Sequence, residues 1–363
     1  MLVDENLYIM WLNRSLNLNT KKIYLLLDGF KTGSNIWNAD KKELLALNGV
    51  TPETVESLEK GKDCFADWCE ELEKLQIEYI SILDSRYPIY LSQIVDPPVG
   101  LYVKGKMYDN EEIFVSMIGS RRCSEYGKNM AYKFSKALAE DGIVIVSGMA
   151  SGIDSICNIG ALDGGGKTIA VLGFGHNHCY PPENRQLMDR IAEEGCLISE
   201  YPPNHGSNRY TFPQRNRIIA GISEGLIVIE AGEKSGTFIT VDFALEMGRK
   251  VMAIPGNITN SFAKGTNDLI KQGCPMITDV DDIYFELEIE KSKKKEVVEE
   301  KIKLSLTEEE RKVYELMDNE ATTIDFITKN LEMSVKDIQY ILTMLELNGV
   351  IQKQPGERYI KTL

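Results

Sequence analysis

Two adjacent arginines stand where a strongly apolar run of residues ends. The run IFVSMIG ends at Gly119 and is followed by Ser120, Arg121 and Arg122. Gly119 permits a sharp backbone turn, and Ser124 can cap the helix that the following residues predict. Free amides at a helix start attract anions, and arginine binds phosphate through two parallel hydrogen bonds. The segment therefore indicates a phosphate site, although taken alone it fits an ordinary surface arginine pair equally well.

The most specific pattern is the segment NRYTFPQRNRIIAG at residues 208–221, in which cations and aromatic rings are interleaved. The cations are Arg209, Arg215 and Arg217, and the rings are Tyr210 and Phe212. Arginines hold phosphates, while an aromatic face stacks a base with about 1–3 kcal/mol per base. The pattern favours single-stranded nucleic acid as the ligand. The alternative is a buried phenylalanine with arginines around it.

Further small and hydroxyl residues follow other predicted strands. Ser147 and Gly148 end the run GIVIVSG, where they allow either the close approach of a ligand or a tight strand-to-helix turn. Ser235, Gly236 and Thr237 follow the run GLIVIEAG and open a helix, so that their hydroxyls and amides can bind a phosphate.

Two lysines extend this set. Lys167 ends the stretch GGGK, which is not a P-loop because a strand rather than a helix follows it; its side chain is still predicted to face the site. Lys264 stands before Gly265 and Thr266 in a similar small-residue loop. Because ligands bind beyond the carboxyl ends of the strands in such sheets, these loops are expected to converge. The predicted ligand-binding residues are Gly119, Ser120, Arg121, Arg122, Ser147, Gly148, Lys167, Arg209, Phe212, Arg215, Asn216, Arg217, Ser235, Gly236, Thr237 and Lys264.

Metal and cofactor chemistry find little support in the sequence. His176, His178 and Cys179 form the stretch HNHC, but a zinc site needs further ligands in matched geometry, and none is evident. The seven cysteines are scattered without a Cys-x-x-Cys pair, which is typical of reduced thiols. We expect no metal, no cofactor and no catalytic residue.

Composition narrows the classes of protein. The formal net charge of −14 argues against broad, nonspecific nucleic-acid binding, because phosphate contacts need lysine and arginine. It still permits a local basic site on an acidic body. We find no run of about 18 apolar residues that would span a membrane and no signal-peptide pattern at the start of the sequence. A cytoplasmic location is therefore expected.

Strand-like and helix-like segments alternate over residues 112–287. Short β-branched runs such as TIAVLGFG and KVMAIPG alternate with helical stretches such as YGKNMAYKFSKALAEDG. This alternation predicts an α/β fold with a mainly parallel sheet covered on both faces, which is a Rossmann-like core.

Three further parts are predicted around this core. Residues 1–80 carry apolar residues at helical spacing, and the Asn-Gly turn within them resembles a helix-hairpin-helix. Because that hairpin carries no lysine or arginine, a helical packing domain is the preferred interpretation. Residues 81–111 predict a connector with short strands, and residues 288–303 predict a charged linker. Residues 304–363 predict three helices and a hairpin, which is a winged helix.

The motifs together resemble the DNA-processing protein A family, also called DprA or Smf. The resemblance rests on IGSRRCSEYG, VSGMASGIDSICNIGAL, YPPENRQL, SEYPP, FPQRNRIIAGIS, EAGEKSGTFIT and GRKVMAIPG in this order, and it covers about residues 80–287. It implies a single-stranded DNA-binding protein rather than an enzyme, which helps to load the RecA recombinase in natural transformation. It also implies a homodimer formed through the core, and DNA contacts by Arg121, Phe212 and the loop at 235–237.

The sequence departs from the family pattern at several positions. Ser151 and Asn158 stand where the family often has arginine and histidine, and Gln214 stands where a basic residue is common. The winged helix has about seven lysines and arginines against about eleven acidic residues. We therefore expect that domain to bind proteins or to regulate, rather than to clamp DNA.

Two other functions remain open at this stage. The core distantly resembles phosphoribohydrolases of nucleoside monophosphates, which carry a catalytic glutamate shortly after Gly-Thr. Here Thr237 is followed by Phe238, Ile239 and Thr240, with no general acid or base. A nucleotide-sensing regulator that binds duplex DNA through its winged helix is the second alternative.

The surface for a homodimer is a separate expectation. Leu269, Ile270 and Met276 are apolar and close to a predicted sheet edge, which makes this segment the candidate contact surface. Burial of these residues within one chain is an equally good interpretation.

Overall fold

The computed structural model describes residues 4–290, 306–317, 322–331, 333–348, 350–354 and 356–361. The chain forms two compact units, residues 1–290 and 291–363. Most of the predicted charged linker, from residue 291 to 303, lies outside the described residues.

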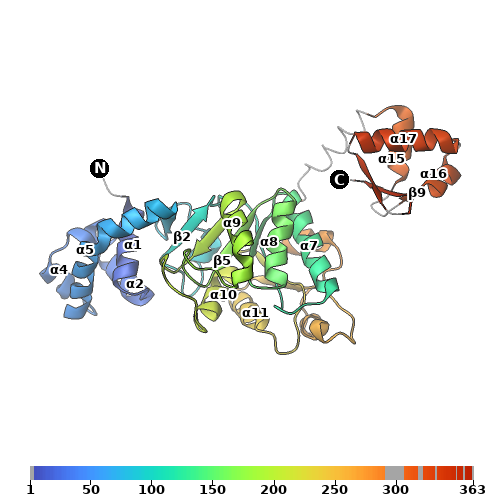
Figure 1. Cartoon of the computed structure of the whole chain (residues 1–363). Helices are drawn as coiled ribbons and strands as arrows, with labels where there is room; N and C mark the ends of the chain where they lie inside the picture. The colour runs from blue at the N-terminus through green and yellow to red at the C-terminus, as the bar shows by residue number, and fades with distance from the viewer. Residues whose placement is uncertain are drawn as a thin grey trace. The chain divides into compact units, whose positions relative to one another are not determined.

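An eight-stranded sheet forms the centre of the first unit (Figure 1). Its order is β1-β2-β6-β5-β4-β3-β7-β8. The strands β3 to β8 are all parallel to one another, and β2 and β1 extend one edge of the sheet by antiparallel pairing. The strands are β1 (Glu78–Ser81), β2 (Gly100–Gly105), β3 (Phe114–Ile118), β4 (Val144–Ser147), β5 (Thr168–Leu172), β6 (Cys196–Ser199), β7 (Gly225–Val228) and β8 (Lys250–Ala253). The predicted mainly parallel, Rossmann-like sheet is confirmed.

Helices cover both faces of this sheet. Successive residues of a strand point to opposite faces, and both faces are apolar here, so each needs a layer of helices. In β3, Phe114 and Ile118 belong to the apolar layer under α6, α10, α11 and α12, whereas Val115 and Met117 belong to the layer under α7, α8 and α13. Figure 1 shows α7, α8 and α9 side by side over the sheet. The helices are α6 (Ile89–Ser92), α7 (Glu125–Glu140), α8 (Ile153–Asp163), α9 (Arg185–Glu194), α10 (Thr211–Ile222), α11 (Thr237–Glu246), α12 (Lys264–Lys271) and α13 (Val280–Leu287).

The strands β3 and β7 are parallel neighbours, and the order in which the chain adds strands to the sheet reverses between them. The chain moves from β3 through β4 and β5 to β6 on one side, and it later places β7 and β8 on the other. A crevice opens at the carboxyl ends of strands where the order reverses in this way. The end of β3 and the end of β7 are therefore where a ligand site is expected.

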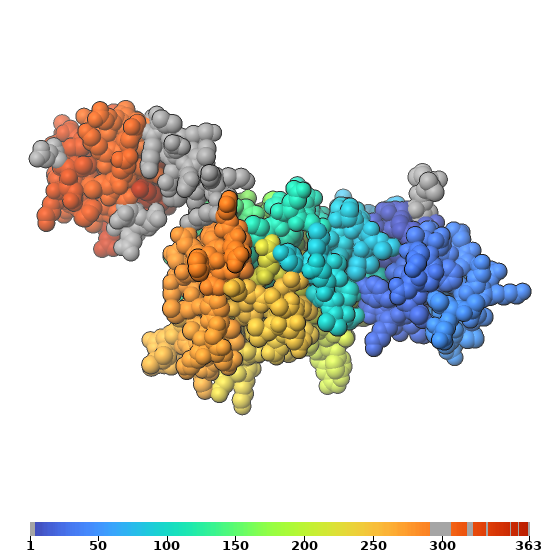
Figure 2. All heavy atoms as spheres, turned by 180° about the vertical axis from the view of Figure 1, so that it is seen from behind, coloured from blue at the N-terminus to red at the C-terminus, as the bar shows by residue number. Residues whose placement is uncertain are grey.

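Five helices precede the sheet and pack against its antiparallel edge. They are α1 (Glu5–Ser15), α2 (Thr20–Phe30), α3 (Gly33–Asn38), α4 (Lys41–Ala46) and α5 (Pro52–Leu75). Their apolar core, which includes the buried Trp11, continues into Tyr79 of β1 and Tyr102 of β2. Figure 2 shows these blue helices packed directly against the cyan segment that follows them. The predicted Asn-Gly turn lies between α4 and α5, with Gly49 at a φ of 96°.

The second unit is a winged helix. Val313, Ile327, Ile338 and Leu342 form its buried centre. It contains α15 (Glu308–Leu316), α16 (Ile324–Asn330), α17 (Val335–Leu347) and the sheet β10-β11-β9, with β9 at Thr322–Thr323, β10 at Ile351–Gln354 and β11 at Arg358–Lys361. This confirms the prediction of three helices and a hairpin.

Candidate nucleic-acid interface

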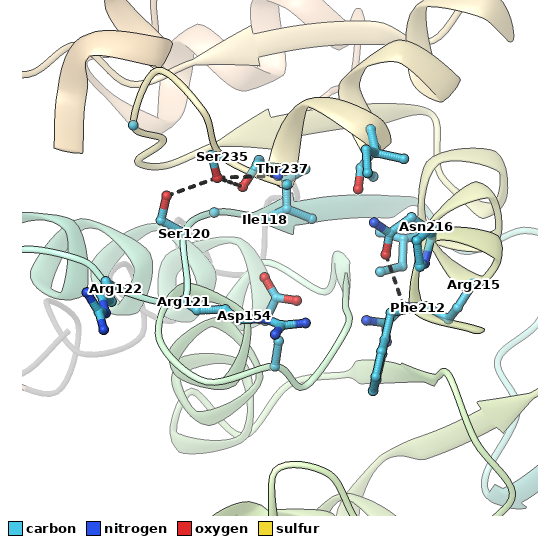
Figure 3. A pocket seen from close by; sticks show the side chains of 18 of the residues that line it. Ile118, Ser120, Arg121, Arg122, Asp154, Phe212, Arg215, Asn216, Ser235 and Thr237 are labelled. Carbon is cyan, nitrogen blue, oxygen red and sulfur yellow. Dashed lines mark hydrogen bonds between the residues drawn. The ribbon is translucent and has the colours of Figure 1, made fainter. Parts of the chain in front are cut away.

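A cavity of about 960 Å³ opens at the carboxyl ends of β3 and β7, where the strand order reverses. Three segments far apart in the sequence supply most of its wall: the loop after β3, the start of α10 and the loop after β7. Figure 3 shows how these segments face one another around Asp154. The structure thus brings together most of the predicted set: Gly119, Ser120, Arg121, Arg122, Arg209, Phe212, Arg215, Asn216, Ser235, Gly236 and Thr237.

Hydroxyl groups line one side of the cavity (Figure 3). The Oγ atoms of Ser120 and Ser235 lie 3.2 Å apart, and Ser235 Oγ lies 2.7 Å from Thr237 Oγ1. Gly236 and Thr237 stand at the start of α11, where the amides of Thr237 and Phe238 make only long hydrogen bonds of 3.3 Å, to Ser235 Oγ and to the Ser235 carbonyl oxygen. Hydroxyls that can reorient beside such amides form a suitable site for a phosphate.

Two buried side chains of opposite charge, Asp154 and Arg215, form the floor of the cavity. The Asp154 carboxylate accepts backbone hydrogen bonds from Gly119, Gly148 and Ala150, and so ties two loops together. Burial raises the pKa of Asp154 to about 6, with Arg215 and these hydrogen bonds acting in the opposite direction. A Cβ atom at Gly148 would lie 2.6 Å from Asp154 Oδ2, which explains why glycine is needed there.

Arg215 acts as part of this floor rather than as an exposed cation. It is 4% exposed, and its guanidinium donates to the carbonyl oxygens of Gly148, at 2.8 Å, and Val171. Burial lowers the pKa of Arg215 to about 10, and the carboxylate of Asp154 counteracts that shift. Most of its donors are already used, so Arg215 holds α10 against the ends of the strands.

Aromatic rings and exposed arginines line the other side of the cavity. The Arg121 guanidinium lies 5.7 Å from the ring centre of Phe212, and the ring centres of Phe212 and Tyr180 are 5.2 Å apart. Arg209 lies 4.6 Å from the ring centre of Tyr210, a residue that is 61% exposed. This is the combination of cation and ring that stacks unpaired bases.

Five predicted residues do not contribute to the wall of this cavity. Arg217 is paired with the buried Glu200 at 2.6 Å, on the other side of α10. Lys167 precedes β5, so it lies at the amino edge of the sheet, where it pairs with Glu112. Ser147 is buried in β4 and donates to the Met117 carbonyl at 2.7 Å.

The fourth such residue, Lys264, pairs with Glu233 at 2.8 Å and stays exposed next to the cavity. Glu233 itself lines the cavity. Carboxylates or a carbonyl oxygen engage Arg217, Lys167, Ser147 and Lys264, and none of the four lines the cavity. That they contact the ligand stays a prediction. Gly148 lies beneath the cavity and lines a smaller one beside it.

Sequence reasoning did not single out several residues that line the cavity. They are Asp154, Tyr180, Asn208, Lys234 and Phe262. Lys234 could have been found, because it stands directly before Ser235 in a loop that was already assigned to the site. Asp154 had no local signal, because its role depends on amides from two different loops.

The HNHC stretch does not form a metal centre in the described part of the chain. No group of three or more histidine, cysteine, aspartate or glutamate side chains that could hold a metal ion occurs among the described residues. His176 is buried with Nε2 3.4 Å from the Leu197 carbonyl oxygen, and burial lowers its pKa to about 4. In the described residues, no helix is both long enough and apolar enough to cross a bilayer.

Two family models match this chain. Residues 78–288 match DNA recombination-mediator protein A, and residues 299–357 match the DprA winged helix domain. The first match covers the whole parallel sheet and the cavity. The second coincides with most of the acidic C-terminal unit.

Similar proteins occur in several bacteria. The chain is 42% identical to DNA processing protein DprA of Bacillus subtilis over 212 residues, which is 58% of this chain and 71% of that protein. It is 44% identical to DprA of Streptococcus pneumoniae over 208 residues, or 57% of this chain and 73% of that one. It is 30% identical to protein Smf of Synechocystis over 366 residues, covering 91% and 92% of the two chains.

Two solved structures have the same fold. The structure of S. pneumoniae DprA superposes with a TM-score of 0.68 at 36% identity and covers 78% of this chain and 98% of that one. The structure of DNA processing protein A from Helicobacter pylori superposes with a TM-score of 0.51 at 28% identity, covering 57% and 94%. The H. pylori structure describes a single-stranded DNA binding mode of that protein.

Proposed function

This chain belongs to the DNA recombination-mediator protein A family, also called DprA or Smf, and we propose that its cavity binds single-stranded DNA. The observation that carries the proposal is the opposition of two walls across one cavity. Ser120, Ser235 and Thr237 offer hydroxyls to a phosphate, while Arg121 and Phe212 offer a cation and a ring.

Binding follows from the chemistry of these two walls. A phosphate beside Ser235 gains hydroxyl and amide donors at the start of α11, and Arg121 and Arg209 add exposed positive charge. Phe212 and Tyr180 present ring faces to bases that are not paired. A duplex keeps its bases stacked inside the helix, so only a single strand can use both walls.

The acidic charge of the whole chain is compatible with this function. Carboxylates neutralise many of the cations elsewhere: Glu200 pairs with Arg217, and Glu112 pairs with Lys167. Arg121, Arg122 and Arg209 are exposed in the wall of the cavity, where their field acts on the strand. Local charge therefore determines binding, rather than the net charge of −14.

Binding rather than catalysis is the proposed activity. The Asp154 carboxyl lies in the cavity wall, but it is buried and its oxygens accept three backbone amides, so it is poorly placed to transfer a proton. Thr237 is followed by Phe238, Ile239 and Thr240, so the glutamate that phosphoribohydrolases carry after Gly-Thr is missing. Glu233, which also lines the cavity, is paired with Lys264 at 2.8 Å. The family resemblance further implies loading of RecA onto the bound strand in the cytoplasm.

A homodimer formed through the core is also proposed. Leu269, one of the residues predicted to form the dimer contact, is 4% exposed and belongs to the core of one chain, so its side chain is not available to a second copy. Met276 is 52% exposed where it bridges to Ala253 at the outer strand β8, and Phe285 on α13 is 80% exposed. These two apolar side chains make the β8 edge the candidate contact surface.

The winged helix is proposed to bind a protein rather than DNA. On the outer side of α17, Tyr340 is 68% exposed and Leu347 is 75% exposed. The charges of Lys336 and Asp337 on the same helix cancel. A helix that enters a DNA groove needs basic residues on that face. Apolar side chains at the surface suit a protein partner better.

The test is a comparison of affinities by fluorescence anisotropy. A short oligo-dT strand, a duplex of equal length and free mononucleotides are titrated with the protein at two salt concentrations. We expect the single strand to bind most tightly and its affinity to fall as salt rises. Preference for mononucleotides with release of free base would instead support the phosphoribohydrolase alternative, and preference for duplex would support the regulator.

A further inference from the structure

A second, smaller cavity adjoins the first and is not needed to hold a phosphate. Its volume is about 240 Å³, and it shares Arg121, Phe212 and Arg215 with the larger cavity. Its remaining wall comes from Tyr180 and Glu183, on the segment before α9, and from the loop after β4. A cavity of about 150 Å³ is already enough to hold a benzene ring. The space therefore suits one planar base.

The walls of this small cavity suit a base better than a phosphate. Tyr180 and Phe212 present rings at 5.2 Å between centres, and Pro181 and Pro182 add apolar surface. Tyr180 is 44% exposed, so part of its ring is free to be covered by a ligand. A flat apolar ligand gains from these contacts, whereas a phosphate would lose its water there.

Glu183 is the unexpected residue in this wall. It is exposed, and its Oε1 atom accepts a long hydrogen bond of 3.4 Å from Ser151 Oγ. A carboxylate beside a strand of phosphates weakens binding by repulsion. A carboxylate only accepts hydrogen bonds, so the part of single-stranded DNA that can compensate for this repulsion is a base edge that donates them.

Guanine has the edge that matches this cavity. Its Watson–Crick edge has two neighbouring donors, N1–H and the N2 amino group, beside one acceptor, O6. Thymine has a single donor, and cytosine and adenine place one amino group beside an acceptor. A carboxylate that faces two parallel donors therefore favours guanine, and an arginine nearby can donate to O6.

We propose that this cavity holds one guanine base of a bound strand, with Glu183 accepting from N1–H and the N2 amino group and Arg121 donating to O6. The proposal rests on the proposed function, because the base must arrive as part of a single strand. It makes Glu183 a specificity-determining residue, and it makes an otherwise sequence-tolerant site prefer guanine at one position of the strand.

Base analogues in the strand test the proposal on the unmodified protein. Short strands in which every second thymine is replaced by guanine, by hypoxanthine or by 7-deazaguanine are compared by anisotropy with an all-thymine strand. Hypoxanthine lacks the N2 amino group, whereas 7-deazaguanine keeps the whole Watson–Crick edge. We expect the guanine and 7-deazaguanine strands to bind equally, and about five- to tenfold more tightly than the hypoxanthine strand.

Two matched variants assign the preference to one carboxylate. Glu183→Gln keeps the size of the side chain, and it should abolish the guanine preference without weakening binding of the all-thymine strand. Glu233→Gln removes the same charge from the wall of the larger cavity. It should change the affinity for all strands by the same factor and leave the guanine preference intact.

Three outcomes decide against the proposal. Equal affinity of the unmodified protein for the guanine and hypoxanthine strands would overturn it, and so would a guanine preference that survives in Glu183→Gln. In both cases the single strands still bind, so the proposed function stands. Failure of every strand to bind would remove the proposed function itself, and the base preference with it.

Discussion

The loop after β3 and the helix α10 each bring two arginines to the same part of the molecule, but they use them in opposite ways. Arg121 and Arg122 in the loop are exposed beyond the edge of the sheet. Arg215 on α10 is 4% exposed, and the Arg217 side chain is 12% exposed. The same residue type is thus available to a ligand in one region and part of the scaffold in the other.

Geometry explains the difference between the two regions. A loop that projects past the strand ends leaves its side chains in water. Residues 215 and 217 are separated by about 200° around the helix axis, so one points at the strand ends and the other at Glu200. Both positions are enclosed by the fold, where a guanidinium persists only with carbonyl or carboxylate partners. An arginine-rich motif in the sequence is therefore not sufficient to predict a phosphate-binding surface.

The strongest test of this comparison is Arg215→Met. Removing the guanidinium leaves the buried Asp154 carboxylate without its cation and two carbonyl oxygens without their donor. We expect the free energy of unfolding to fall by about 3–5 kcal/mol, because a buried carboxylate loses its compensating charge. Chemical denaturation measures it. A loss below about 1 kcal/mol would show that Arg215 is not part of the scaffold.

Arg121→Ala should give the opposite result. Arg121 is exposed, so stability should change by less than about 0.5 kcal/mol. Affinity for single strands should fall about tenfold through the loss of a charged hydrogen bond. The slope of log affinity against log salt should become shallower by about 0.7. Unchanged affinity would place Arg121 outside the binding site.

Phe212→Ala separates stacking from charge at the same wall. The ring faces both Arg121 and Tyr180, so its loss removes a surface for a base. We expect affinity to fall by about 1–2 kcal/mol while the salt slope stays the same, because no cation is lost. Titrations at several salt concentrations measure both quantities. A shallower slope would mean that Phe212 acts mainly by positioning Arg121.

Lys264→Ala should have the smallest effect. Its ammonium group pairs with Glu233 in an exposed position, so the lysine already has a counter-charge and contributes little to a phosphate. We expect single-strand affinity to change by no more than about twofold, measured by the same titration. A loss as large as that of Arg121→Ala would show that the pair with Glu233 opens when the strand binds.

The sequence was sufficient for the architecture, because short-range patterns encode it. Apolar runs ending in glycine predicted the parallel strands, and small residues after β3 and β7 predicted the loops that meet at their carboxyl ends. The position of Lys167 could also have been predicted. It precedes a strand rather than following one, and in a parallel sheet that places it at the amino edge.

The sequence by itself determined which residues occupy the rim of the sheet, because strand direction and loop position are local properties. Only the tertiary structure decided which of them can meet a ligand. Asp154 lies 61 positions before Arg215. Glu200 reaches Arg217 because it directly follows β6, which lies three places from β3 in the sheet. Such partnerships between distant segments neutralise some arginines and leave others free, and no local pattern encodes them.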